Sequence, residues 1–114
     1  MGKAVPGEVV LFEGSDGVER VRAVCRRSGG GGLELVQESA GEVSRWCFGE
    51  SPHRAVLRID ARQVRALARY FRVRDAGGVA AALEIEVAGI DCLTRTRRLL
   101  TLLDKAEHFF EKTA

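Results

Sequence analysis

The residues with the clearest chemical potential lie in the segment RWCFGESPHR, residues 45–54, which holds a thiol, Cys47, and an imidazole, His53. A thiol beside an imidazole is the usual arrangement of an activated nucleophile. A turn over residues 49–52 would let these two side chains approach each other. However, the sequence shows no third group to orient the imidazole, and a single cysteine in a strand is more often a packed side chain. We rank packing above catalysis for this pair.

A metal or cofactor site has little support. Cys47, His53 and His108 are the plausible soft ligands, and they lack the paired short spacings typical of structural zinc. The three cysteines of the chain are widely separated and include no CxxC pair, which argues against a disulfide framework. We expect reduced thiols, no metal and no cofactor.

Arginine dominates the basic residues, with fifteen arginines against three lysines, although the net charge is only +2. Between positions 54 and 74 there are seven arginines and one acid, Asp60. Guanidinium groups bind carboxylates and phosphates through paired hydrogen bonds, so an anionic partner would be held here. The candidate anion-binding residues are Arg54, Arg58, Arg62, Arg65, Arg69 and Arg72. The last four recur on one helical face, a pattern that is also typical of a solvated helix surface, and we give this second interpretation more weight.

The elements that position these residues begin with strands. The segments at residues 8–14, 18–27, 33–38, 43–48 and 53–60 are short, apolar or alternating, and separated by turn residues. Val21, Ala23 and Cys25 fall on one face of the second segment, which we expect to be at most half-buried. The parity of the fourth segment places Trp46 and Phe48 on one buried sheet face.

Two glycine-rich features mark turns between these strands. The Asp-Gly pair at residues 16 and 17 is typical of a tight hairpin. The four glycines at residues 29–32 precede a predicted strand and lack a following GK[ST], so they predict a hairpin loop and not a phosphate cradle.

The pattern changes to helical spacing at Asp60. Asp60 and Gln63 form a capping-box pattern, and an apolar face follows at Val64, Leu67, Ala68 and Phe71. Residues 79–88 fit both an alternating strand and a helical row, and the alanine run favours a helix. Residues 94–114 predict a long amphipathic helix.

The last predicted helix has an apolar stripe wider than one sheet face requires. Adjacent apolar pairs make up this stripe, and they predict contact with a partner through Leu100, Leu103, Phe109 and Phe110. A helix wedged between the sheet and another helix would need a similarly broad stripe, so burial within the chain is the competing explanation.

The sequence therefore predicts one α+β domain over residues 1–114, sheet over 1–59 and mainly helical over 60–114. An antiparallel meander of about five strands is followed by two or three helices on one face. We expect a cytoplasmic, non-enzymatic protein without a membrane segment. It should act through protein contacts, self-association as a homodimer included. Binding of single-stranded nucleic acid or another anion through the arginines at 54–74 is the alternative.

Overall fold

The computed structural model describes residues 8–15, 19–41, 46 and 53–113, with side chains up to Ala106. Four antiparallel strands form one sheet in chain order: β1 (Glu8–Ser15), β2 (Glu19–Arg27), β3 (Leu33–Gly41) and β4 (His53–Ile59). Three helices follow, α2 (Ala61–Phe71), α3 (Ala76–Glu86) and α4 (Cys92–Thr113). The predicted α+β class, antiparallel sheet and later helices are confirmed.

The number of strands differs from the prediction. The described residues form four strands, whereas we expected about five. The expected strand at 43–48 lies outside the described residues except for Trp46, and the turns at 16–17 and 49–52 also lie outside them. Trp46 is helical and 88% exposed, so its predicted place on a buried sheet face is wrong. Alternation over six residues was too short a pattern to separate strand from helix.

The glycine run closes the hairpin between β2 and β3, as predicted. Ser28 N–H donates to the carbonyl of Gly32 over 3.0 Å, and Gly30 and Gly31 have φ angles of +72° and +82°. Gly32 is needed for a different reason. A Cβ atom there would lie 2.7 Å from the carbonyl oxygen of Ile59 and 2.7 Å from Ser28 Oγ. The loop can therefore pack against the end of β4 only because residue 32 has no side chain.

Helix α2 begins with the predicted capping box. Gln63 N–H donates to Asp60 Oδ1 over 2.8 Å, and Asp60 N–H donates to Gln63 Oε1 over 3.0 Å. These bonds satisfy amides that the first helical turn leaves free. Val64 and Leu67 are buried against the sheet, which confirms the predicted apolar face.

The ambiguous segment at 79–88 is helical over most of its length. Helix α3 buries Val79, Ala80 and Leu83, while Ile85 is exposed. Its N-cap, Asp75, accepts a hydrogen bond from Gly78 N–H over 2.8 Å. The preference of the alanine run for a helix was the correct guide here.

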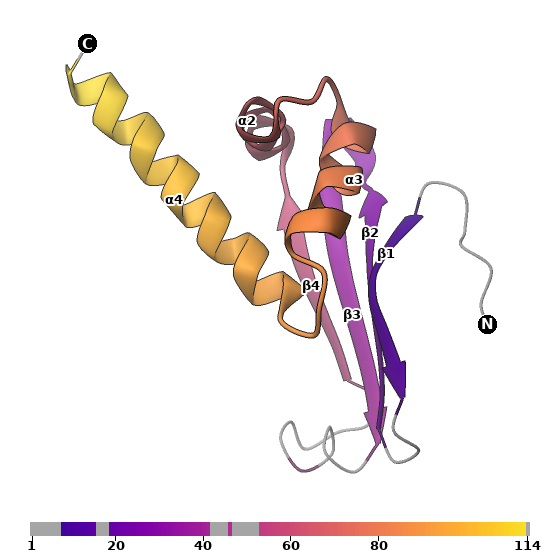
Figure 1. Ribbon diagram of the computed structural model, residues 1–114. Helices are drawn as coiled ribbons and strands as arrows, with labels where there is room; N and C mark the ends of the chain where they lie inside the picture. Colours follow the sequence, from indigo (N-terminus) through magenta and orange to yellow (C-terminus); the bar gives the residue numbers. More distant parts are fainter. Residues whose placement is uncertain (1–7, 16–18, 42–45, 47–52, 114) are drawn as a thin grey trace.

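The helices cover one face of the sheet, and the buried core lies between them (Figure 1). Leu33, Leu35 and Ile59 supply much of the sheet side of this core. A bulge in β1 lets both Leu11 and Phe12 join it. No helix among the described residues is long and apolar enough to cross a bilayer.

Strand β2 is more buried than the sequence predicted. Ala23 and Cys25 face the helices as expected, but Val24, on the opposite face, is also buried. The expectation of a half-buried strand was wrong because β2 lies inside the sheet, where strands on both sides shield Val24.

Helix α4 is anchored to the body through its first turns only. Cys92, Thr96 and Leu100 are buried, and beyond them the helix leaves the body and projects away from the sheet (Figure 1). The molecule is accordingly elongated, with extents of 53 × 29 × 23 Å. Thr96 Oγ1 is buried without a hydrogen-bond partner, which weakens this anchor.

We predict that Gly32→Ala lowers the free energy of unfolding by about 2 kcal/mol, because its Cβ would overlap the backbone of Ile59. Gly29→Ala is the matched control, since a Cβ at residue 29 meets no atom within 4 Å. Urea unfolding of both variants measures the difference. Equal stabilities would contradict the close approach of this loop to β4.

We also predict that Thr96→Val raises the free energy of unfolding by about 1 kcal/mol, because valine keeps the shape and removes a buried, unpaired hydroxyl. Thr101→Val is the control, since the Thr101 hydroxyl is paired with the carbonyl of Arg97 over 3.0 Å. Thermal unfolding should show stabilisation for residue 96 alone. A loss of stability at residue 96 would show that its hydroxyl has a partner in solution.

Candidate functional site

The sheet face opposite the helices, here called the outer face, carries its side chains in ordered rows. Strand register aligns four valines in a central row, and the rows on either side of it alternate glutamate with arginine. In order from β1 to β4, the rows are Glu8, Arg26, Glu34 and Arg58; Val10, Val24, Val36 and Val56; and Glu13, Arg22, Glu38 and Arg54. Opposite charges directly across a strand pair stabilise the sheet.

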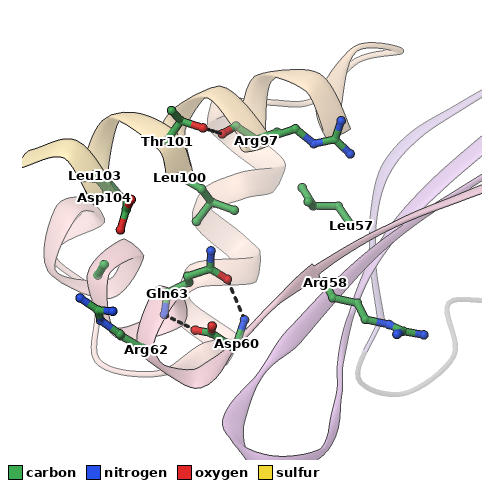
Figure 2. A pocket seen from close by; sticks show the side chains of 11 residues that line it. Leu57, Arg58, Asp60, Arg62, Gln63, Arg97, Leu100, Thr101, Leu103 and Asp104 are labelled. Carbon is green, nitrogen blue, oxygen red and sulfur yellow. Dashed lines mark hydrogen bonds between the residues drawn. The ribbon is translucent and has the colours of Figure 1, made fainter.

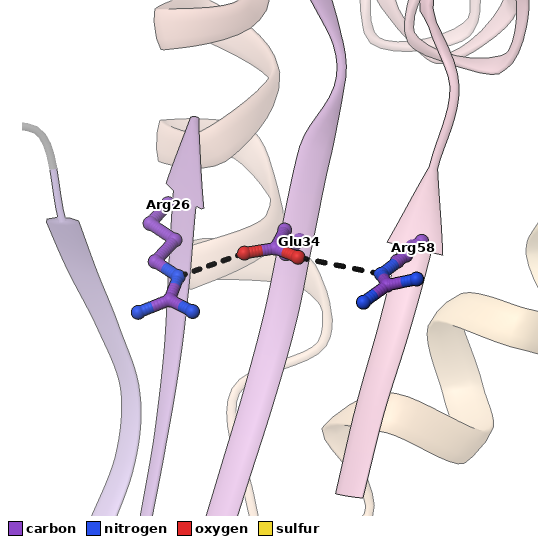
Figure 3. A network of polar contacts seen from close by, with 3 residues as sticks. All are labelled: Arg26, Glu34 and Arg58. Carbon is purple, nitrogen blue, oxygen red and sulfur yellow. Dashed lines mark hydrogen bonds and ion pairs between the residues drawn. The ribbon is translucent and has the colours of Figure 1, made fainter. Parts of the chain in front are cut away.

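Ion pairs join neighbouring residues within each charged row. Arg26 Nε lies 2.9 Å from Glu34 Oε1, and Arg58 Nε lies 3.6 Å from Glu34 Oε2, so one carboxylate lies between two guanidinium groups (Figure 3). The side chain of Glu34 is only 18% exposed, whereas that of Arg58, on the edge strand, is 84% exposed. In the other row, Arg22 Nε lies 3.0 Å from Glu13 Oε2. The interior of the outer face is therefore locally neutral, and its exposed positive charge lies at β4.

The six candidate anion-binding arginines fall on two separate surfaces. Arg54 and Arg58 belong to the outer face of β4. Of the other four, Arg62, Arg65 and Arg69 are exposed on α2, on the opposite side of the sheet. Arg72 is exposed just beyond α2, as its C-cap in the left-handed conformation, so the predicted helical stripe ends before it. The change of period at Asp60 separates the two sets, because the chain leaves the sheet plane there. The sequence analysis placed the six arginines in one group because they are close together in the sequence, which does not show that the chain changes direction at Asp60.

A pocket of about 420 Å³ lies where the end of β4 meets α2 and α4 (Figure 2). Leu57 and Leu100 line it, and Arg58 points away from the helices (Figure 2). Its lining combines apolar side chains with three arginines and two aspartates: Leu57, Arg58, Asp60, Arg62, Gln63, Ala66, Arg97, Leu100, Thr101, Leu103 and Asp104. The sequence analysis missed this pocket, because its walls come from three elements whose relative placement only the fold determines.

The predicted partner-contact leucines have different environments. Leu100 is buried in the core of its own chain, and Leu103 is partly buried against that core. Leu102, which the prediction did not include, is 63% exposed. The side chains of Phe109 and Phe110 lie outside the described part of the structure.

A shallow hollow of about 470 Å³ lies along the outward side of α4, away from the body. It is lined by Thr94, Arg97, Arg98, Thr101 and Leu102, and most of its surface is apolar. Leu102 at its end gives α4 an exposed apolar side in addition to the side that joins the core.

The thiols that the structure describes are buried. Burial raises the pKa of the Cys25 thiol to about 12, and the nearby Cys92 adds to this effect. Burial also raises the pKa of Cys92, whose Sγ–H donates to Gln37 Oε1 over 4.0 Å. Both cysteines are free. They are protonated at neutral pH and serve the core, as the sequence predicted for reduced, packed thiols.

The predicted pair of Cys47 and His53 remains untested. Cys47 lies outside the described residues, and His53 begins β4 in a partly buried position. Within the ranges that the structure describes, no three His, Cys, Asp or Glu side chains gather where they could hold a metal ion.

Comparison with known proteins assigns no family to this chain. No family model matches the chain, and neither a curated protein nor a solved structure does.

We predict that stability falls as the pH rises from about 9 toward 12, and that Cys25 is one cause. The folded chain keeps the Cys25 proton up to a pKa of about 12, whereas the unfolded chain releases it near the ordinary thiol pKa of 9.0. Cys25 therefore contributes a loss of roughly 1.4 kcal/mol per pH unit across this window, and none below it.

Cys25→Ala isolates this contribution from the other groups that titrate at alkaline pH. The free energy of unfolding, measured in urea between pH 8 and 11, should fall less steeply for this variant than for the natural chain. Parallel slopes for the two proteins would contradict the buried, high-pKa thiol.

Proposed function

We propose that this chain is a non-enzymatic protein-interaction domain that self-associates as a homodimer through α4. The observation that supports the proposal best is the outward side of α4, which combines the exposed Leu102 with an apolar hollow. A helix that leaves the body of a small domain with apolar surface on an uncovered side is a typical contact element. We further propose a cytoplasmic location, which fits the free thiols of Cys25 and Cys92.

A second copy of the chain is the occupant that the charges of α4 favour. Its first turns contain no acid and three arginines, Arg95, Arg97 and Arg98, while residues 104–112 contain three acids and two lysines. An antiparallel pair of α4 helices would place each basic end beside an acidic end. It would also oppose the two helix dipoles favourably, with each positive N-terminus near a negative C-terminus.

This antiparallel arrangement also brings the end of each α4 to the hollow of the other copy. When the two helices cross at Leu102 and Leu103, residue 98 lies opposite residue 107, and residue 109 lies opposite residue 96, at the level of the hollow of the other copy. In this arrangement, the proposed partner contact of Phe109 and Phe110 would be with the hollow of the other copy. The predicted partner role of these two residues becomes part of the proposed dimer, and Leu102 takes the place of the buried Leu100.

Anion binding through α2 is a second candidate function. The arginines at 62, 65 and 69 are exposed on α2, Arg72 is exposed at its C-cap, and Tyr70 on the same helix is 56% exposed. Spaced guanidinium groups beside an exposed aromatic ring suit a single-stranded nucleic acid. If Arg65→Glu combined with Arg69→Glu leaves the binding of a labelled oligonucleotide unchanged, this candidate is wrong.

We predict that the natural chain is a dimer at micromolar concentration and that Leu102→Glu with Phe109→Glu makes it a monomer. The two glutamates would place charge in the apolar contact, which should weaken association by at least about tenfold. Sedimentation equilibrium measures the mass of each protein.

Ile85→Glu is the control, because Ile85 is an apolar residue on α3 that is even more exposed than Leu102, 81% against 63%, and lies outside the proposed contact. This variant should remain a dimer. A natural chain that stays monomeric at 100-fold higher concentration would overturn the proposed dimer.

A further inference from the structure

We propose that the free edge of β4 binds an extended segment of another protein by strand addition, and that this segment carries two acidic residues four positions apart with apolar residues between them. The proposal extends the proposed function, contact with proteins, to a surface separate from the outward side of α4. It is carried by the order of charges on the outer face and by the pocket beside β4.

Strand β4 is the edge that the described fold leaves available. It pairs with β3 on one side, and no described strand pairs with its other side. The opposite edge, β1, is partly occupied, because Gly89 N–H donates to the carbonyl of Leu11 over 3.2 Å. Unpaired backbone groups along an edge strand are a template for another strand.

The charge rows specify what such a strand should carry. Each charged row begins with a glutamate on β1, alternates across the sheet and ends with an arginine on β4. The next strand would continue the alternation with an acid opposite Arg58 and an acid opposite Arg54. Since these arginines are four residues apart on one face, the two acids must be four residues apart as well. The valine row calls for a β-branched residue midway, opposite Val56.

The same charges disfavour a second copy of β4 in the register that would continue the valine row. A two-fold antiparallel pairing centred on Val56 would place Arg54 of each chain opposite Arg58 of the other, and like charges directly across a strand pair are destabilising. Arginines on an edge strand thus protect it from self-pairing. They do not protect it from an acidic strand, so the edge is selective.

The inward side of the edge has room for apolar side chains. Residues of an added strand that face the helices would lie beside Ala55 and Leu57, and Leu57 lines the pocket with Leu100 and Leu103 of α4. An added strand would therefore lie between β4 and α4, with its acids on the outer face and an apolar side chain in the pocket. The five central residues of the added strand are therefore expected to be acid, apolar, valine, apolar and acid.

A nucleic acid fits this edge less well than a peptide. Arg58 lies 3.6 Å from the carboxylate of Glu34, and the register places Arg54 opposite Glu38. A phosphate chain crossing the outer face would meet these glutamates, whereas an added strand keeps its carboxylates one strand beyond the arginines. The glutamates on β3 therefore favour an acidic strand over a polyanion.

Binding of a fluorescein-labelled peptide with the core Glu-Leu-Val-Leu-Glu, followed by anisotropy, tests the proposal. The charge-reversed core Lys-Leu-Val-Leu-Lys should bind at least about fivefold more weakly, because two ion pairs become two repulsions. The core Glu-Leu-Pro-Leu-Glu should also bind weakly, because proline disrupts strand pairing. Equal binding of the three peptides would overturn the proposal.

Charge reversal in the protein sharpens this test. Arg54→Glu with Arg58→Glu should reverse the preference, so that the lysine peptide binds better than the glutamate peptide. Arg65→Glu with Arg72→Glu changes the net charge equally on α2 and should leave the preference unchanged. If the first variant does not fold, Arg54→Gln with Arg58→Gln should still abolish the preference, and a retained preference would overturn the proposal.

Two further measurements distinguish strand addition from the proposed dimer and from binding of a nucleic acid. The monomeric Leu102→Glu, Phe109→Glu variant should bind the acidic peptide as the natural chain does, so failure of the dimer and failure of strand addition are distinguishable. A single-stranded oligonucleotide should not displace the bound peptide. Displacement that is lost in the Arg54→Gln, Arg58→Gln variant would overturn the peptide assignment in favour of a polyanion.

Discussion

The cross-strand register of the sheet is the constraint on which the rest of the structure depends. Because side chains alternate between two faces, a single register places every apolar residue of the core on one side and every charged row on the other. A shift of one residue would bury Arg26 and Glu34 beneath the helices and expose Leu35. The same register arranges the glutamates and arginines so that each of the two charged rows ends in an arginine on β4.

The helices leave two distinct surfaces outside the buried core, and we propose a partner for each. Helix α2 follows β4 directly through the Asp60 cap, and α4 is anchored through its first turns before it leaves the body. The wedge between β4, α2 and α4 holds the pocket, while the outward side of α4 lies away from it. We propose that the β4 edge selects an acidic strand and that α4 pairs with a second copy of itself. Under this proposal, one chain of 114 residues presents surfaces for two partners of different chemistry.

Local sequence patterns predicted the elements well and the surfaces poorly. The capping box at Asp60, the period of Val64 and Leu67, and the glycine hairpin each depend on neighbours within a few residues, so they could be found from the sequence. The burial of Val24 depends on the strands that lie on both sides of β2, and the sequence does not contain that information directly. The grouping of Arg54 with Arg72 failed for the same reason, since closeness in sequence did not place them on one surface. The β4 edge could be recognised only after the register had aligned Glu34 with Arg58.

Amide hydrogen exchange at β4, followed by NMR, tests the central claim that this strand is a free and charge-selective edge. In the chain alone, alternate amides between Arg54 and Arg58 should exchange rapidly, because one side of β4 lacks a strand partner. Saturation with the Glu-Leu-Val-Leu-Glu peptide should protect those amides while the exchange of β1 stays unchanged. Full protection of β4 before the peptide is added, or new protection confined to α2, would contradict the account.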